Sequence, residues 1–266
     1  MARHARRGVG APSQGRLSRE RCLVENQDEL VTVGRVVGLW RYPVKSMAGE
    51  ALPHVDVGWQ GLPGDRRWAF VKDGDPASGF PWLTLRDRPE MARYAPRLRD
   101  PGRPDASPTV VRTPAGGDID VTDPALTAAL WPAGARVIRD QRGIYDTFPL
   151  SLITTATVRS LGALVGRELD VRRFRPNLLV EAAGGAPFPE DAWVGCELAV
   201  GAARMRVDKR DGRCVVVTLD PDDGARDPRV LRRIAQDRGG CLGVYGTTVT
   251  PGRVAVGDSV MVTRVA

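Results

Sequence analysis

The chain has 266 residues, a length that fits one large domain or two medium domains with a sizeable core. Hydrophobic residues make up 42% and charged residues 27%, which is globular composition and excludes disorder along the whole chain. The longest apolar runs fall well short of the roughly 18–20 residues that cross a bilayer, so we expect no membrane span. The 30 glycines and 21 prolines predict short strands joined by tight turns.

The formal net charge of +7 is concentrated at the amino terminus. Six arginines and one glutamate fall within the first 22 residues, which leaves the remainder of the chain close to neutral. We expect residues 1–32 to form a disordered basic tail. A nucleic-acid-binding module that uses this tail is the weakest hypothesis, because basic residues interleaved with aromatic ones are missing from the sequence. We therefore expect neither nucleic acid nor membrane as a partner.

Taken in chain order, hydrophobic patterning predicts many strands and few helices. The first half is expected to contain strands at 33–42, 55–57 and 67–71, a hairpin from 110–113 to 119–121, and a short helix at 124–130. The second half is expected to contain a helix through about Leu164, capped by Thr154 or Thr155, and another helix at 229–235. Its strands are expected at 178–180, 197–200, 204–207, 215–217, 243–246, 252–258 and 260–262.

This order of elements predicts a mainly β fold with minor helices, of the α+β class. We expect two units after the tail. Residues 33–130 would form an N-terminal β-barrel-like domain, and residues 131–266 would form a second β-barrel domain packed against it.

The histidine and cysteine inventory excludes several chemistries. With only His4 and His54, a histidine-built metal site or a Ser-His-Asp triad has at most one plausible imidazole. The four cysteines include no C-x-x-C pair, which argues against a zinc ribbon or an iron–sulfur cluster. Because the sequence shows no secretory signal, we expect free thiols and a cytoplasmic location.

One cysteine has a neighbour that could activate it. Arg213 precedes Cys214, and a guanidinium favours the thiolate, which attacks electrophiles or binds soft metals. The alternative is a buried cysteine that acts as a small hydrophobe. Loops beside predicted strand ends also carry Lys45, Ser46 and Arg66. These residue types suit a phosphate or a polar heterocycle, although their spacing leaves open whether they converge.

Seven segments together carry a family resemblance, and they run in order from residue 33 to about residue 263. They are 42–46 (YPVKS), 64–68 (GDRRW), 145–149 (YDTFP), 174–177 (FRPN), 190–195 (EDAWVG), 212–221 (GRCVVVTLDP) and 254–258 (VAVGD). By these segments the chain resembles the MOSC proteins that have an N-terminal MOSC β-barrel. Within them it is similar to the mitochondrial amidoxime-reducing component family and its bacterial relatives.

The resemblance implies a molybdenum cofactor, which is a pyranopterin dithiolene with a terminal phosphate. Cys214 would then be the protein ligand to molybdenum. The residues that would hold or line the cofactor are Lys45, Ser46, Arg66, Thr147, Arg175, Asn177 and Arg213. Asp146 and Tyr245 would handle protons or orient the substrate.

Four positions depart from the family pattern, and the differences concern the range of substrates. Gly212 stands where family members have a serine, and Phe148 replaces another pocket serine. After the cysteine, the chain has Val-Thr-Leu-Asp-Pro at 217–221 where the family has Thr-Thr-Val-Asp-Pro. The lost hydroxyl donors bear on substrate range more than on cofactor binding.

The resemblance implies an oxidoreductase that reduces N-hydroxylated small molecules by two electrons. Electrons would come from a separate donor protein of the iron–sulfur, flavin or haem type, because the chain stops at Ala266 without the cysteines of an iron–sulfur domain. The alternative is a carrier that delivers the molybdenum cofactor or sulfur and uses Cys214 without redox turnover.

Overall fold

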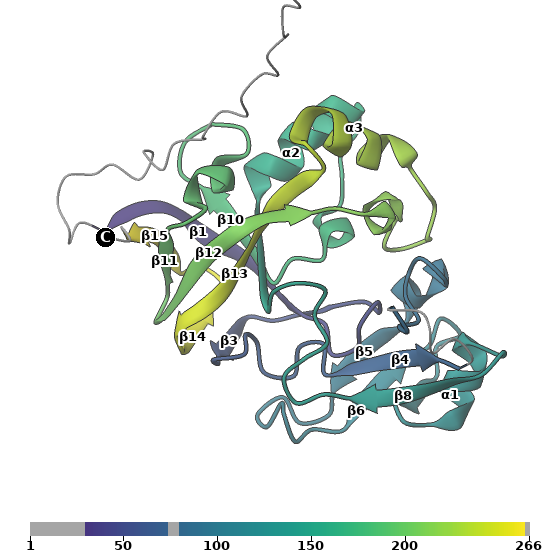
Figure 1. Cartoon of the computed structure of the whole chain (residues 1–266). Coiled ribbons are helices and arrows are strands. Elements are labelled where there is room, and N and C mark those ends of the chain that lie inside the picture. Colours follow the sequence, from purple (N-terminus) through teal and green to yellow (C-terminus); the bar gives the residue numbers. More distant parts are fainter. Residues whose placement is uncertain (1–29, 74–79, 264–266) are drawn as a thin grey trace, which may run out of the picture.

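The structure, a computed structural model, describes residues 30–73 and 80–263. The predicted basic tail therefore lies almost entirely outside the described residues. Within the described ranges the chain is mainly β, and it has three α-helices and four short 3-10 helices. Figure 1 shows an upper barrel with the N-terminal unit beneath it. This arrangement confirms the predicted fold class.

Seven strands close into a barrel in the order β1-β10-β9-β13-β12-β11-β15, and β15 and β10 both pair with β1. Only β9 and β10 pair in parallel. The bounds are β1 Val31–Arg41, β9 Leu150–Thr154, β10 Leu178–Ala182, β11 Glu197–Val200, β12 Ala203–Gly212, β13 Cys241–Thr250 and β15 Ser259–Thr263. The interior is filled by apolar side chains such as Val36, Leu152, Leu198 and Val244, all of them fully buried.

Three small sheets, β14-β3, β4-β8 and β5-β6-β7, complete the N-terminal unit and join it to the barrel, while β2 extends the barrel sheet beside β1. The bounds are β2 Glu50–Ala51, β3 His54–Val57, β4 Trp68–Lys72, β5 Ala95–Leu98, β6 Thr109–Arg112, β7 Asp118–Asp120, β8 Ala135–Arg139 and β14 Gly252–Ala255. Strand β2 pairs with β1, and β3 pairs with β14, so both pairings connect the two units. The N-terminal core holds Phe70 and Met91 together with Leu126 of α1 (Pro124–Leu130). Leu219, from the second half of the chain, packs into the same core.

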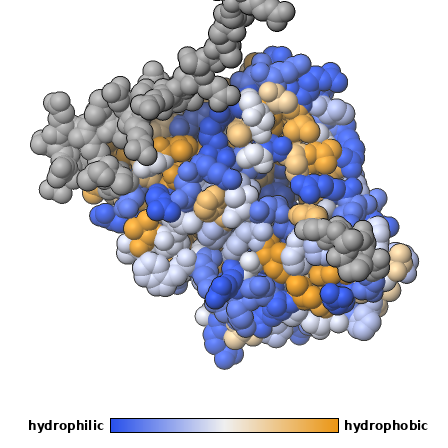
Figure 2. Space-filling view, in the orientation of Figure 1, coloured by the Kyte–Doolittle hydropathy of each residue, from blue (hydrophilic) through white to orange (hydrophobic). Residues whose placement is uncertain are grey.

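Helices α2 (Thr155–Val165) and α3 (Pro228–Arg238) pack against each other and against the barrel through a third apolar cluster. The Thr154 side chain accepts a hydrogen bond from the Thr157 amide, so this predicted N-cap is confirmed. The 3-10 helices span Pro89–Arg93, Val171–Phe174, Pro189–Trp193 and Val215–Thr218. Figure 2 shows that hydrophobic side chains on the viewed face form separate patches in a mainly hydrophilic surface.

Two sequence-based expectations are wrong. Val215–Thr218 is a 3-10 helix rather than a strand, because the chain turns after Cys214 and buries Val217 beside α3, where tertiary packing overrides β propensity. Cys196 is disulfide-bonded, so free thiols are not found at every cysteine, although Cys214 and Cys241 are free. The domain boundary at residue 130 stays a prediction. Strand β1 belongs to the barrel although it precedes the N-terminal sheets in sequence.

Because β1 closes the barrel, a valine-to-alanine substitution in its buried face should lower the free energy of unfolding much more than the same substitution at an exposed valine. Val36→Ala removes two methyl groups from a fully buried position and should lower the free energy of unfolding by about 2 kcal/mol. Val256→Ala, at a residue 47% exposed, should change it by less than about 0.5 kcal/mol. Urea unfolding followed by circular dichroism measures both. Equal effects would contradict the placement of Val36 in the barrel core.

Candidate functional site

A hollow between the barrel and the N-terminal unit, which we call the junction pocket, gathers residues from segments far apart in sequence. Eight of the ten predicted site residues line it: Lys45, Ser46, Arg66, Asp146, Arg175, Arg213, Cys214 and Tyr245. The other two are not among its lining residues. Asn177 lies buried behind the wall, and Thr147 is exposed beside Asp146.

Cys214 reaches the pocket because β12 ends just before it and the chain turns into a 3-10 helix that it caps. Its thiol is free and half-buried. The preceding Arg213 is held by several contacts. It donates to the carbonyl oxygens of Leu242 at 2.8 Å and Phe174 at 2.7 Å, and its Nη2 lies 2.8 Å from Asp211 Oδ2. The segment before the cysteine is therefore fixed in place.

Three cofactor-binding candidates adopt left-handed backbone conformations. The φ angles are +68° at Ser46, +50° at Arg66 and +51° at Arg175. Among the described residues, only one other non-glycine residue, Phe188, has a positive φ. Left-handed conformations disfavour residues with a Cβ and tend to persist where function requires a particular side-chain direction. Their concentration at one pocket marks it as a functional site.

Two arginines that line the pocket lie over one buried aromatic ring. The guanidinium carbons of Arg66 and Arg175 lie 4.7 Å and 4.4 Å from the centroid of the Tyr42 ring. The Tyr42 hydroxyl donates to the Pro176 carbonyl at 3.1 Å, and burial raises its pKa to about 12. Tyr42 is therefore a neutral platform that holds two cations close together.

Arg175 carries a positive charge that the protein leaves largely uncompensated. Its Nη1 donates to the Met47 carbonyl at 2.6 Å, and no ion pair joins it to a carboxylate among the described residues. Burial lowers its pKa to about 10, so it remains a cation at neutral pH. A buried cation without a carboxylate partner favours the binding of an anion.

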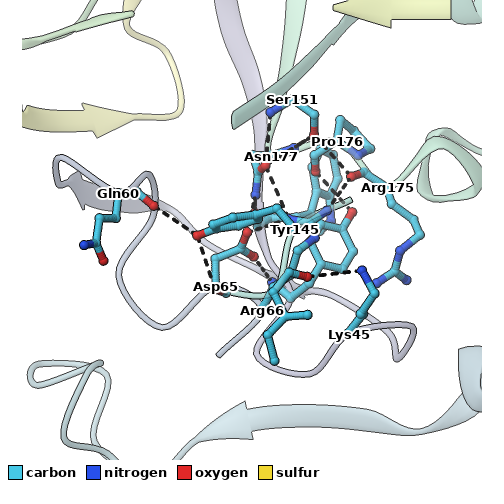
Figure 3. A network of polar contacts seen from close by, with 12 residues as sticks. Lys45, Gln60, Asp65, Arg66, Tyr145, Ser151, Arg175, Pro176 and Asn177 are labelled. Carbon is cyan, nitrogen blue, oxygen red and sulfur yellow. Dashed lines mark hydrogen bonds and ion pairs between the residues drawn. The ribbon is translucent and has the colours of Figure 1, made fainter. Parts of the chain in front are cut away.

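Arg66 is held by a network behind the pocket (Figure 3), and Asp65 is its centre. Asp65 is fully buried and accepts from the Tyr42 amide at 2.6 Å and from Asn177 Nδ2 at 3.3 Å, and it forms an ion pair with Arg66. Burial alone would lower the pKa of Arg66, but the charge of Asp65 and its hydrogen bond to Arg66 have a larger combined effect, so the pKa of Arg66 is raised overall. Asn177 Oδ1 also accepts from the Ser151 amide and hydroxyl, both at 3.2 Å. Asn177 thus positions the residues that line the pocket.

Lys45 and Asp146 form an ion pair in which the lysine side chain is buried and the aspartate side chain is exposed. Lys45 Nζ lies 2.6 Å from Asp146 Oδ1, and the side chains are 6% and 61% exposed. Burial lowers the pKa of Lys45, while Asp146 raises it in part. Burial raises the pKa of Asp146, but Lys45 and the nearby guanidinium groups of Arg66 and Arg86 outweigh it and lower that pKa overall. Each member of the pair therefore favours the charged form of the other.

The lining residues that sequence reasoning did not predict as site residues include Arg86 and Asp211. Arg86, on the exposed loop before Pro89–Arg93, bonds to the Cys214 sulfur, and this bond raises the pKa of Arg86. Asp211 is 1% exposed, and burial raises its pKa to about 6. Asp211 shares the buried face of β12 with Ala203, Met205 and Val207. It ends the charged run Asp208–Asp211, and such a run predicts a solvent-exposed segment, which is why Asp211 was missed.

Chemically, the junction pocket offers one soft sulfur ligand surrounded by cations. Such a donor set fits an anionic cofactor that carries a soft metal, because a free thiol can ligate the metal while guanidinium and ammonium groups bind phosphate. Gly212, two residues before Cys214, also lines the pocket, and a Cβ added to it would meet no atom within 4 Å.

Comparison with known proteins supports this interpretation. Residues 33–145 match the MOSC N-terminal beta barrel domain family, and residues 139–261 match the MOSC domain family. The chain therefore belongs to the MOSC proteins, with the N-terminal barrel domain that many of them carry, and the resemblance seen in its sequence is confirmed.

The curated relatives are distant but align over most of the chain. Mitochondrial amidoxime-reducing component 1 of Mus musculus is 23% identical over 95% of this chain and 89% of its own length. Mitochondrial amidoxime reducing component 2 of Homo sapiens is 26% identical over 83% of this chain and 77% of its own. The YuaD protein of Bacillus subtilis has the same fold, with a TM-score of 0.50 at 14% identity over 90% of this chain and 99% of that one.

The open space at Gly212 predicts that a serine, the family's residue there, is tolerated. Gly212→Ser should change the free energy of unfolding by less than about 1 kcal/mol. Gly243→Ser is the matched comparison, since Gly243 has a φ of +73° and its added Cβ would lie 2.8 Å from the Leu152 carbonyl oxygen. It should cost about 1–3 kcal/mol. Urea unfolding of both variants measures this, and an equally destabilised Gly212→Ser would show that the space is filled.

The Lys45–Asp146 pair predicts a coupled titration. Asp146→Asn removes the charge that partly opposes burial, so the pKa of Lys45 should fall further. The pKa of Asp146 is lower in the folded protein than its usual value, so the ion pair stabilises the fold at pH values above the usual aspartate pKa. This stabilisation is lost as the pH falls through the lowered pKa.

A titration of the Lys45 Cε resonance by NMR measures the shift. Asp87→Asn, which removes the partner of Lys72 instead, is the control. An unchanged Lys45 titration in Asp146→Asn would contradict the assigned coupling.

Proposed function

We propose that this protein is a molybdenum-cofactor-dependent oxidoreductase that reduces N-hydroxylated small molecules by two electrons. The observation that carries the proposal is the convergence of a free thiol with cations from distant segments in one pocket. Family membership and the amidoxime-reducing relatives point the same way.

Each pocket residue then has a physical task toward the cofactor. Cys214 would be the protein ligand to molybdenum. Lys45, Ser46, Arg66 and Arg175 would bind the pterin and its phosphate, and charge-assisted hydrogen bonds of this kind contribute roughly 1.5–3 kcal/mol each. The cofactor, when bound, supplies the two-electron redox chemistry, while the protein supplies position and electrostatics.

The remaining predicted residues support this arrangement from the pocket wall, from behind it or from its rim. Arg213 fixes the cysteine segment through carbonyl oxygens, and Asn177 positions Arg66 and Ser151. Thr147 adjoins Asp146 on an exposed segment, where it would contact a ligand only at the edge of the pocket. Asp146 and Tyr245 would orient substrate or handle protons.

A separate donor protein of the iron–sulfur, flavin or haem type would supply the electrons. The donor would approach the pocket from the side of Arg86 and Asp146, which both line it and are exposed. None of the described helices is both long and apolar enough to cross a membrane. The cytoplasmic location stays a prediction.

A carrier of the molybdenum cofactor or of sulfur is the second candidate. The favouring observation is the similarity to the molybdenum cofactor sulfurase of Drosophila grimshawi, 26% identical over 77% of this chain but only 31% of that protein. A carrier would hold molybdenum through Cys214 without turning over benzamidoxime when a competent artificial reductant is supplied. The turnover assay therefore separates the two candidates.

Molybdenum retention tests the role of Cys214. Cys214→Ala should lose the metal and turnover while the fold persists, because the soft ligand is removed from the pocket. Cys241→Ala, at the other free thiol and outside the pocket lining, should retain both. Metal analysis of protein made in a cofactor-competent host measures retention, and turnover that persists in Cys214→Ala would refute the assignment.

The same assay tests the cations. Lys45→Ala and Arg175→Ala should each lower molybdenum content before they affect folding, because each removes a donor to an anion. Unchanged metal content in both variants would contradict their role as cofactor-binding residues.

A further inference from the structure

Asp211 is a buried carboxylic acid in the junction pocket with one uncommitted oxygen. Its Oδ2 lies 2.8 Å from Arg213 Nη2, whereas its Oδ1 is buried and has no hydrogen-bond partner among the described residues. A buried acceptor without a partner costs about 1–3 kcal/mol relative to a paired one. Asp211 nevertheless lines a pocket where a ligand or a proton could complete its bonding.

The groups around Asp211 come from several segments of the chain. They are Arg213 on its own strand end, Tyr245 on β13, Arg66 from the N-terminal unit and Asp146 from the segment before β9. The cations and the Tyr245 hydroxyl favour the carboxylate form, while burial and Asp146 favour the acid form. Burial dominates and raises the pKa to about 6, so the acid and the carboxylate are both populated near neutral pH.

We infer that Asp211 is the proton donor for N–O bond cleavage in this pocket, with Tyr245 as the neighbour that tunes it. The inference rests on the proposed function. Two acids line the pocket. Asp146 pairs with Lys45 and is exposed, whereas Asp211 pairs with Arg213 through Oδ2, is buried, and keeps Oδ1 without a hydrogen-bond partner among the described residues. Gly212, the next residue, also lines the pocket and carries no side chain there.

The step balances as follows. An N-hydroxylated substrate takes up two electrons and two protons, the N–O bond breaks, and the products are the N–H compound and water. The Asp211 carboxyl O–H bond breaks to supply one proton, and solvent supplies the other and later reprotonates the carboxylate. The electrons come from the reduced donor protein of the iron–sulfur, flavin or haem class. A positioned general acid of this kind contributes roughly 10²–10⁴-fold to a rate.

The first test uses cofactor-free protein. NMR of protein labelled at the aspartate carboxyl carbon should show one resonance that titrates near pH 6 and is missing in Asp211→Asn. Asp208→Asn, on the same strand but bonded to Arg206 and Thr247 outside the pocket, should retain it. The Tyr245 hydroxyl lowers the pKa of Asp211 in the wild-type protein, so its removal in Tyr245→Phe should move this titration to higher pH. Titration of Asp211 below pH 5 would overturn the inference.

The second test uses loaded enzyme with benzamidoxime as the probe. Wild-type kcat should fall as the pH rises through the pKa of Asp211. This falling limb of the pH–rate profile should shift to higher pH in Tyr245→Phe. Asp211→Asn should retain molybdenum, lose the limb and lower kcat at pH 5 about 100-fold. If wild-type protein does not turn over, the proposed function fails. If wild-type protein turns over and Asp211→Asn matches it within about twofold, only the role of Asp211 fails. Should Asp211→Asn not fold, an unshifted limb in Tyr245→Phe overturns the inference.

Discussion

Two guanidinium groups buried against a single tyrosine ring are the constraint on which the site depends. Arg66 and Arg175 both lie within 5 Å of the Tyr42 ring centroid, and two like charges so close in a poorly hydrated region repel each other. Asp65 compensates the charge of Arg66 from behind the pocket, whereas the Arg175 guanidinium donates only to the Met47 carbonyl oxygen among the described residues. The protein therefore maintains a positive field in the pocket, and an anionic ligand relieves it.

The fold creates this field by closing a barrel with a strand from the beginning of the chain. Strand β1 pairs with β15 and β10, and the chain leaves the barrel at Arg41 directly into Tyr42. The next residues bring Lys45 and Ser46 to the pocket. Closure through β10 places Arg175 opposite them, because Trp40 donates to the carbonyl oxygen of Asn177. Barrel stability and pocket geometry thus depend on the same strand pairings.

The sequence predicted local structure well where local rules decide it. The strand at β1 follows its alternating pattern, and the Thr154 cap and the proline at the start of α3 mark helix starts by backbone chemistry. The strand predicted at 215–217 was wrong, because burial of Val217 against a distant helix overrides the propensity of three valines. Strand β9 was missed, because its five residues are buried on both faces and show no alternation.

For the site, motif resemblance identified the residues, but only the structure shows their convergence. Lys45, Arg66 and Arg175 were candidates from residue type, and no spacing rule could bring them together before the barrel closed. Asp211 belongs to a charged run of β12 that predicts solvent exposure, and Arg86 lies on a loop whose sequence carries no catalytic signature. These two residues are the structure's own contribution to the account.

The central claim is that the Cys214 sulfur faces the cationic pocket in order to ligate molybdenum. X-ray absorption at the molybdenum edge, on protein isolated from a cofactor-competent host, tests it most directly. The account predicts a protein thiolate sulfur bound to the metal in addition to the dithiolene sulfurs. Protein that contains molybdenum without that extra sulfur, or that contains no molybdenum, would contradict it.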